Sequence, residues 1–298
     1  MSSDTHTGAI ARIAAGIDGY PEGRDAAVLA SVIARATGAE LMLVAVHPDP
    51  LIVLPREFGW KGMHKQAEAL LRETRDALAP GARIDVETDW SVPRALERVV
   101  TREHRDLLVV GSSRNGPEGQ VRIGSRTRQL LYDGKCAVAA APRGLSGGGE
   151  RQLARIGVGY EGGPESRAAL SLAGSIAVAA GAKLLVHGVI DDRMPAVGWT
   201  GAGSALVAES WNEVIDQEVR SLREEADSAA DATGADAEVE TLRGRPADAL
   251  LKLCDEVDLL VIGSRRWGAA ARVLLGRTGE ALMHDASCPV LVAARGDD

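Results

Sequence analysis

One sequence pattern occurs twice in this chain, and it constrains the fold more than any other feature. RIAAGIDGYPEGRDAAVLAS at Arg12–Ser31 has a counterpart in RIGVGYEGGPESRAALSLA at Arg155–Ala173. Each begins with a short apolar stretch and continues through a Gly-rich turn that carries an acid, then a proline and an Ala-rich segment. This order predicts a strand, a turn and a helix. Such internal similarity indicates two copies of one structural unit.

The two copies continue through the same series of segments. In each copy a glycine closes the first helix and an apolar strand follows. After a variable segment come another strand, a helix that opens at a proline, and two more strands. The strand-bearing segments are Thr37–Pro48, Arg83–Thr88, Asp106–Ser113 and Cys136–Gly144 in the first copy, and Ala180–Asp191, Ala237–Leu242, Asp258–Arg265 and Cys288–Gly296 in the second, with helices opening at Pro93 and Pro246.

Strands that alternate with helices predict an α/β fold, in which an open, mostly parallel sheet has helices on both faces. The length of 298 residues suits two domains of about 150 residues each. We predict a first domain over residues 1–144, a linker over 145–152 and a second domain over 153–298. The linker contains LSGGGE at Leu145–Glu150, whose three consecutive glycines predict a flexible connection.

Composition argues against several classes of function. The 34 basic residues against 42 acidic ones give a net charge of −8, which disfavours non-specific binding to nucleic acid. No run approaches the roughly 18 uninterrupted apolar residues of a membrane helix, and no basic segment followed by an apolar core opens the chain. We therefore expect a cytoplasmic protein with no nucleic-acid or membrane partner.

Three cysteines, Cys136, Cys254 and Cys288, lie far apart in the sequence and form no C-x-x-C pair. This number and spacing of cysteines argue against a disulfide framework and against a zinc site. We expect three free thiols in a reducing compartment.

Candidate ligand-binding residues follow from the rule that open parallel sheets bind ligands at the carboxyl ends of their strands. Asp18 follows the first strand, where it can accept a hydrogen bond from a sugar hydroxyl or a purine amine. Gly111 is expected to let the backbone approach a ligand closely. Gly124 and Ser125 open a helix whose free N–H groups suit phosphate, and Thr127 adds a hydroxyl.

These residues resemble the universal stress protein family. That family has an Asp after its first strand and a loop of the form G-x2-G-x9-G-[ST], which holds ATP or AMP in its nucleotide-binding branch. The resemblance covers nearly the whole chain, twice, and implies two tandem Rossmann-like domains of the adenine-nucleotide alpha-hydrolase type. The residues carried over are Asp18, Val46, Gly111, Arg114, Gly124, Ser125 and Thr127 in the first copy, and Glu161, Val189, Gly263 and Gly276 in the second.

In that branch the adenosine lies between the acid and a valine that ends the second strand, while the phosphates rest on the glycine loop. This chain departs from the pattern in both copies. Arg114 and Arg266 replace the middle glycine of the loop, where an arginine either closes the phosphate space or adds a charged fork to it. The second copy also has Arg277 for the final Ser or Thr and Glu161 for the Asp. The sequence therefore favours the first copy as the binding site.

The resemblance also implies how the two copies associate. In the family the final strands pair across a two-fold dimer. Here Cys136–Pro142 and Cys288–Ala294 are expected to pair within one chain and give a pseudo-dimer. Association of two such chains into a homodimer stays open.

Three functions are compatible with this sequence. The first is a stress-response sensor or regulator that binds adenine nucleotide without turning it over. Its cofactor is ATP or AMP, with or without Mg²⁺, or no nucleotide if both loops are degenerate. The second is a nucleotide-free interaction scaffold. The third, an ATP-hydrolysing enzyme, is disfavoured because the sequence has no G-x4-G-K-[ST] loop, H-x3-H pair or G-x-S-x-G elbow.

Two variable segments, Asp49–Pro80 and Asp191–Gly234, differ between the copies. Each predicts an irregular loop followed by a long amphipathic helix. The simpler interpretation is a covering helix with a surface loop. The alternative is that the loops gate a ligand or dock a partner.

Overall fold

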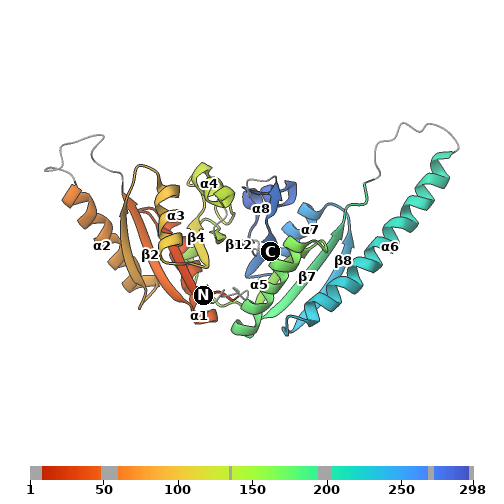
Figure 1. Cartoon of the computed structure of the whole chain (residues 1–298), viewed down its shortest axis with the longest axis horizontal. Coiled ribbons are helices and arrows are strands. Elements are labelled where there is room, and N and C mark those ends of the chain that lie inside the picture. Colours follow the sequence, from red (N-terminus) through yellow and green to blue (C-terminus); the bar gives the residue numbers. More distant parts are fainter. Residues whose placement is uncertain (1–8, 48–59, 134–135, 194–202, 268–271, 295–298) are drawn as a thin grey trace, which may run out of the picture.

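The computed structural model describes residues 9–47, 60–133, 136–193, 203–267 and 272–294. Ten strands form one continuous sheet in the order β3-β2-β1-β4-β5-β12-β9-β6-β7-β8, and the two domains lie side by side along its length (Figure 1). The first domain contributes β1 (Arg12–Ile17), β2 (Glu40–His47), β3 (Arg83–Thr88), β4 (Leu107–Gly111) and β5 (Ala137–Ala141). The second contributes β6 (Arg155–Tyr160), β7 (Lys183–Ile190), β8 (Ala237–Arg243), β9 (Leu259–Gly263) and β12 (Val290–Ala293).

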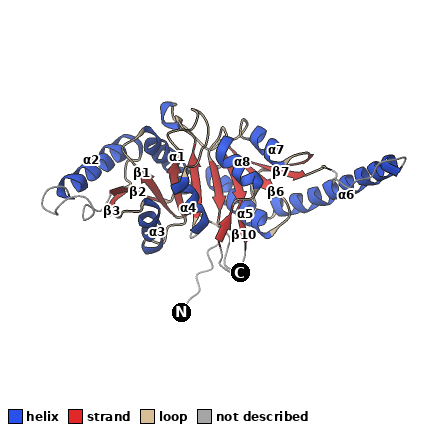
Figure 2. Cartoon of the chain, turned by 90° about the horizontal axis from the view of Figure 1, so that it is seen from above, coloured by secondary structure: helices blue, strands red, loops and turns tan. Residues whose placement is uncertain are grey.

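Within each domain every strand pairing in this sheet is parallel, which confirms the predicted α/β fold. Helices lie on both sides of the sheet (Figure 2). They are α1 (Pro21–Thr37), α2 (Trp60–Leu78), α3 (Val92–Arg102) and α4 (Ser125–Asp133) in the first domain, and α5 (Pro164–Ala180), α6 (Gly203–Asp231), α7 (Pro246–Leu253) and α8 (Arg277–Asp285) in the second.

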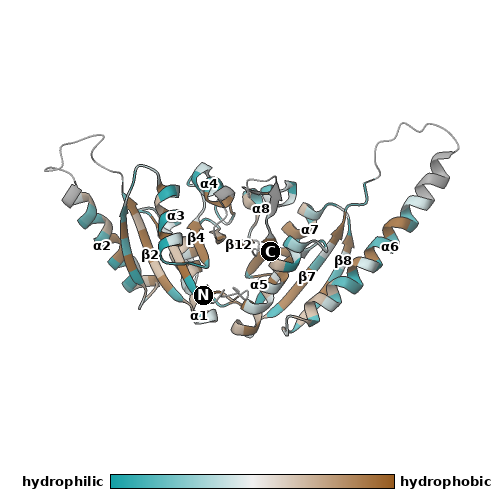
Figure 3. Ribbon diagram, in the orientation of Figure 1, coloured by the Kyte–Doolittle hydropathy of each residue, from teal (hydrophilic) through white to brown (hydrophobic). Residues whose placement is uncertain are grey.

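Alternation along the strands divides the core into two layers. Ile13 and Ala15 of β1 belong to the cluster beneath α1, α2, α5 and α6, whereas Ala14 belongs to the cluster beneath α3, α4, α7 and α8. Successive side chains of a strand point to opposite faces, so a strand covered on both faces is apolar throughout. Figure 3 shows this contrast between mostly brown strands and outer helices that carry teal positions.

The helix signals in the sequence mark real boundaries. α1 begins at Pro21 and α5 at Pro164, where the missing proline N–H costs no helical hydrogen bond. Both helices end at a glycine in the left-handed region, with φ of 70° at Gly38 and 62° at Gly181.

The start of the linker is more ordered than its glycines suggest. Leu145–Gly147 forms a short 3-10 turn, and the Leu145 side chain is buried. The fully buried carboxylate of Asp25 accepts hydrogen bonds from the N–H groups of Gly144 at 2.8 Å and Ser146 at 2.7 Å. A charged acceptor with two backbone donors holds this segment against α1. The start of the linker is therefore fixed, although the sequence predicted a flexible connection.

The two domains meet through their last strands. β5 and β12 pair antiparallel, with Ala140 opposite Val290 and Ala139 opposite Leu291. This confirms the predicted pairing of the final strands within one chain.

The variable segments contain the predicted long helices, α2 and α6. α6 is joined to the end of β7 by a hydrogen bond from Trp211 Nε1 to the Asp192 carbonyl, at 3.1 Å. The loops proposed to gate a ligand or dock a partner fall largely on residues 48–59 and 194–202, which lie outside the described residues.

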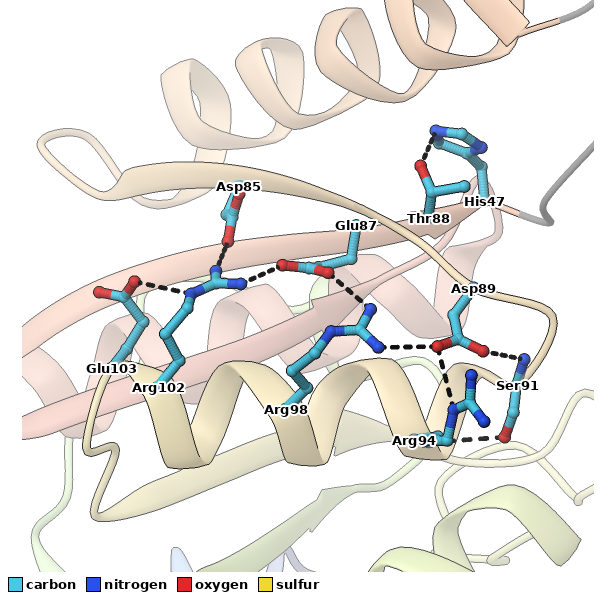
Figure 4. Close-up of polar contacts among 10 residues, drawn as sticks. All are labelled: His47, Asp85, Glu87, Thr88, Asp89, Ser91, Arg94, Arg98, Arg102 and Glu103. Carbon is cyan, nitrogen blue, oxygen red and sulfur yellow. Dashed lines mark hydrogen bonds and ion pairs between the residues drawn. The ribbon is translucent and has the colours of Figure 1, made fainter. Parts of the chain in front are cut away.

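A charged network joins β3 to α3 (Figure 4). Asp85, Glu87 and Asp89 are two residues apart along the strand, and Arg94, Arg98 and Arg102 are four apart along the helix. Both spacings place side chains on one face. The contacts are Arg102 with Asp85 and Glu87 at 2.6 Å, Arg98 with Glu87 and Asp89 at 2.8 Å, and Arg94 with Asp89 at 3.2 Å.

Asp89 makes this network sensitive to acid. Burial alone would raise its pKa, but hydrogen bonds from Arg98, the Ser91 N–H and Arg94 outweigh burial and lower the pKa from 3.8 to about 2. A pKa lowered by folding stabilises the protein above pH 3.8, and that contribution is lost as the pH falls towards 2. We expect Asp89→Asn to flatten the fall of unfolding free energy between these pH values in urea titrations.

The matched control is Glu68→Gln, which removes an exposed carboxylate paired with Arg72 one helical turn away on α2. It should leave the pH dependence in this window as it is in the wild type. An equal flattening in both variants would contradict the role assigned to Asp89.

Candidate functional site

The first predicted site lies at the carboxyl end of β1. Asp18 follows this strand, and its Oδ1 accepts the Tyr20 N–H at 3.2 Å. Burial raises the pKa of Asp18, while the Tyr20 N–H and the positive charge of Arg114 oppose that rise. The carboxylate is thus held by the turn that leads into α1, close to an arginine from the loop after β4.

Arg114 lies on the aromatic face of Tyr20. Its Cζ atom is 3.4 Å from the ring centroid, a cation–π contact. Because the charge of Arg114 also acts on Asp18, the guanidinium lies at the acid end of the site. The structure therefore brings together Asp18 and Arg114, two residues that the sequence places far apart.

Gly111 and Gly263 have a packing role that the sequence interpretation missed. A Cβ atom on Gly111 would lie 2.1 Å from the carbonyl oxygen of Glu22 in the first turn of α1. The equivalent Cβ on Gly263 would lie 2.5 Å from the carbonyl oxygen of Glu165 in α5. The side of Gly111 that lacks a Cβ therefore faces helix backbone, while the close approach of a ligand to this glycine stays a prediction.

The loop of the first domain extends across to the second. Ser112 anchors its base, donating to the Ala141 carbonyl at 2.7 Å and accepting the Arg122 N–H at 3.1 Å. Further along, the Val121 N–H donates to the Ala286 carbonyl at 2.7 Å. The Ile123 N–H donates to the Met283 carbonyl at 3.0 Å. The loop predicted to hold phosphate is therefore bonded to the end of α8 in the other domain.

α4 begins where the sequence predicted, at Ser125, and the Arg128 N–H donates to the Gly124 carbonyl at 3.0 Å. Ser125 is exposed and Thr127 is buried. A Cβ on Gly124 would be in ordinary contact with Ser113, whose Cβ would be 3.9 Å away, so a larger residue fits at this position. Val46, half-buried, is the penultimate residue of β2.

The starts of α4 and α8 are tied together across the domain boundary. Arg128 Nη1 lies 2.5 Å and 2.6 Å from the two carboxylate oxygens of Glu280. Arg122 Nη2 lies 3.4 Å from Nδ1 of His284. Arg128 is the fourth residue of α4 and Glu280 the fourth of α8, so their ion pair joins the first turns of the two helices.

In the second domain all four predicted residues line one cavity of about 940 Å³. These residues are Glu161, Val189, Gly263 and Gly276. They come from the carboxyl ends of β6, β7 and β9 and from the residue that precedes α8. The structure thus brings together the acid, the strand-two valine and the helix start that the sequence placed in one site.

Charged side chains surround this cavity. Asp191 pairs with Arg193, whose side chain and N–H lower the pKa of Asp191 to about 2. Arg245 lies 3.8 Å from Asp248, and both side chains are largely exposed. Arg277, at the first position of α8, is exposed and forms no ion pair with another residue of the described part of the chain. A cationic side chain therefore stands at a helix N-terminus that opens onto the cavity.

Sequence reasoning missed Tyr160, His187 and Arg245, which also line the cavity. Burial lowers the pKa of His187, and Glu240, 3.4 Å from its Nε2, opposes that change. The signal available in the sequence was position. Tyr160 ends its strand, His187 lies near the end of the next, and Arg245 precedes the proline that opens α7.

The loop after β9 differs from the expected irregular phosphate loop. β10 (Arg265–Trp267) and β11 (Arg272–Leu274) pair antiparallel, with Arg266 opposite Val273. A ladder of backbone hydrogen bonds fixes this segment as a hairpin. The part between the two strands, residues 268–271, lies outside the described residues.

Two further classes of site were sought in the described residues. They contain no group of three or more His, Cys, Asp or Glu side chains arranged to hold a metal ion. None of their helices is long and apolar enough to cross a membrane.

Comparison with known proteins agrees with this architecture. A universal stress protein from Archaeoglobus fulgidus superposes with a TM-score of 0.65 at 19% identity, over 98% of this chain and all of that one. A protein of unknown function from Pseudomonas aeruginosa superposes with a TM-score of 0.63 at 18% identity, over 97% and 94%. At these identities the likeness concerns the fold alone.

One curated relative is the "universal stress protein in QAH/OAS sulfhydrylase 3′ region" of Thermus aquaticus. It is 40% identical over 53 residues, which are 17% of this chain and 39% of that protein. The sequence model of the Universal stress protein family matches the chain twice, at residues 10–142 and 153–294. The chain therefore belongs to the universal stress protein family and is a tandem member of it.

Proposed function

We propose that this chain binds an adenine nucleotide, ATP or AMP, as a sensor or regulator in the stress response. The observation that carries the proposal is the cavity of about 940 Å³ lined by Glu161, Val189, Gly263 and Gly276. Its volume is within the range of about 300–1,000 Å³ typical of small-molecule sites. The resemblance to the family assigns the same four residues to nucleotide binding.

The lining of the cavity offers groups that suit both parts of a nucleotide. Glu161 and Val189 offer a carboxylate and an apolar surface for the nucleoside. α8 begins after Gly276, where unpaired N–H groups and the helix dipole favour an anion. Arg277 adds a full positive charge there, so the departure from the family's Ser or Thr replaces a hydroxyl donor with a cation.

The motifs favoured the first domain, and that preference stays a prediction. Asp18, Val46, Gly124, Ser125 and Thr127 retain the family pattern there, and a Cβ on Gly124 would contact only Ser113, at 3.9 Å. Arg114 was expected either to close the space for phosphate or to add a charged guanidinium to it. Its contact with Tyr20 favours the second alternative, because the side chain extends along the acid end of the site. We propose that both domains are candidates and that an experiment should separate them.

Calorimetric titration with ATP and with AMP tests the proposal. Arg277→Glu places a negative charge at the start of α8 and should weaken binding to the second domain at least about tenfold, or 1.4 kcal/mol. Gly124→Asp does the same at the start of α4, where a Cβ fits. Arg223→Glu, at an exposed site on α6 paired with Asp227, is the matched control and should bind like the wild type.

Each outcome has a definite meaning. Weaker binding only in Arg277→Glu assigns the site to the second domain, and weaker binding only in Gly124→Asp assigns it to the first. Absence of saturable heat at millimolar nucleotide in the folded wild type would overturn nucleotide binding and leave the interaction scaffold. We further propose that ATP is bound and not turned over, so chromatography after long incubation should recover it unhydrolysed.

A further inference from the structure

Cys254 and Cys288 are far apart in the sequence, but the fold places them together. Cys254 follows α7 and donates its N–H to the Leu250 carbonyl at 3.1 Å, while Cys288 lies two residues before β12. Next to them, Ser287 Oγ donates to Asp255 Oδ1 at 2.8 Å. The Leu260 N–H donates to the Pro289 carbonyl at 2.9 Å. These bonds hold the two cysteine-bearing segments side by side, which the sequence arithmetic did not foresee.

The two thiols contact each other directly. Each is the side-chain hydrogen-bond partner of the other, and each residue is only 3% exposed. The backbone N–H groups of Ser287 and Cys288 act in the same direction as the Cys288 thiol and lower the pKa of Cys254. All three neighbours therefore favour the thiolate form of Cys254.

The neighbouring groups shift the pKa values of the two thiols in opposite directions. The hydrogen bond from the Cys288 thiol lowers the pKa of Cys254 against the effect of burial. The same contact and burial raise the pKa of Cys288 well above its usual value. Cys254 is thus the nucleophile of the pair and Cys288 its protonated neighbour. The third cysteine differs, because burial outweighs a backbone hydrogen bond from Leu108 and raises the pKa of Cys136 to about 12.

A cavity gives small molecules access to the pair. It has a volume of about 380 Å³, and both cysteines line it. Leu29 and Val32 line it from the first domain, so it lies between the two domains. Its lining also includes the exposed residue Gln152, which places its mouth at solvent. A hydroperoxide is small enough to enter a space of this size.

We propose that Cys254 and Cys288 are an oxidation site at which a hydroperoxide converts two thiols into a disulfide. The Cys254 thiolate attacks one peroxide oxygen, the O–O bond breaks, and the departing oxygen leaves as water or alcohol after taking up a proton. The Cys254 sulfenic acid then reacts with Cys288. The S–S bond forms as the S–O bond breaks, and the hydroxyl leaves as water with the Cys288 proton. The thiols lose two electrons and the peroxide gains them.

The bridge would act at the seam of the pseudo-dimer. It would tie the end of α7 to the segment that leads into β12, the strand that pairs with β5. Oxidation would therefore add a covalent link between these two segments on the side of the β5–β12 pairing that faces the cavity. This inference does not depend on nucleotide binding, and its test needs no nucleotide.

The experiment treats the folded full-length protein with hydrogen peroxide, quenches the reaction, and counts thiols in denaturant. The count should fall from three to one, and peptide mapping should find a Cys254–Cys288 linked pair 2 Da lighter than the two thiols. Cys136→Ser is the matched control and should form the same bridge. Cys288→Ser should accumulate a Cys254 sulfenic acid that dimedone traps, and Cys254→Ser should form neither product.

Other results would overturn the proposal. These are chains linked through Cys136, oxidation of Cys254 to sulfinic acid with no linked peptide, or a bridge that forms only after denaturation. The peptide map of the wild-type protein decides between them even if a serine variant fails to fold.

Discussion

Gly111→Ala is expected to lower the free energy of unfolding by about 3 kcal/mol, at the upper end of the usual cost of overpacking. The added Cβ would lie 2.1 Å from the Glu22 carbonyl oxygen, a backbone atom that no rotamer change can move away. The first turn of α1 must shift, and Asp18 lies three residues before that helix. Urea unfolding followed by circular dichroism measures the loss.

Gly19→Ala is the matched control, because a Cβ there meets nothing within 4 Å. It should change stability by no more than about 0.5 kcal/mol. Gly263→Ala provides a graded comparison, since its Cβ would lie 2.5 Å from the Glu165 carbonyl oxygen and its cost should be somewhat smaller. A wild-type melting curve for Gly111→Ala would falsify the packing role assigned to this glycine.

Leu291→Ala should cost about 2–5 kcal/mol, the range for truncating a buried leucine. Leu291 is fully buried in β12, where it pairs with Ala139 of β5 and Val261 of β9. Its removal leaves a void at the strand that joins the two domains, and small neighbours such as Ala139 cannot fill it. The cost should appear as a lower urea midpoint, read by circular dichroism.

The comparison variant is Val214→Ala on α6, whose side chain is 47% exposed. It also deletes methyl groups but removes little buried surface, so its midpoint should stay near that of the wild type. Equal losses in the two variants would show that burial at the seam does not set the stability of this region.

Much of this fold is predictable from sequence because its signals are local. Pro21, Gly38, Pro164 and Gly181 mark helix ends through their own backbone chemistry, and the repeat supplies each prediction twice. The pairing of the last strands came from the family resemblance. Both kinds of inference identify elements and their order, and the structure agrees with them.

Features that depend on contacts between residues far apart in the sequence were harder to predict. Gly111 looks the same in the sequence whether its open side faces a ligand or the backbone of Glu22, and only the fold decides. The contact between Cys254 and Cys288 likewise arises from strand order and leaves no spacing motif. The β10–β11 hairpin, in which Arg266 is opposite Val273, was missed because the family pattern predicts a phosphate loop at this position.

The seam between β5 and β12 is asymmetric in a way that favours one arrangement of halves. A symmetric dimer joins a surface to its own copy, but here Ala139 and Ala140 of one strand face Leu291 and Val290 of the other. Two β5 strands would set small side chains against small ones and leave voids, and two β12 strands would crowd large ones together. At two of the three paired positions the two surfaces therefore fit each other better than themselves, and the third pairs Val138 with Val292. Because the halves are not interchangeable at this seam, each can keep a site of its own.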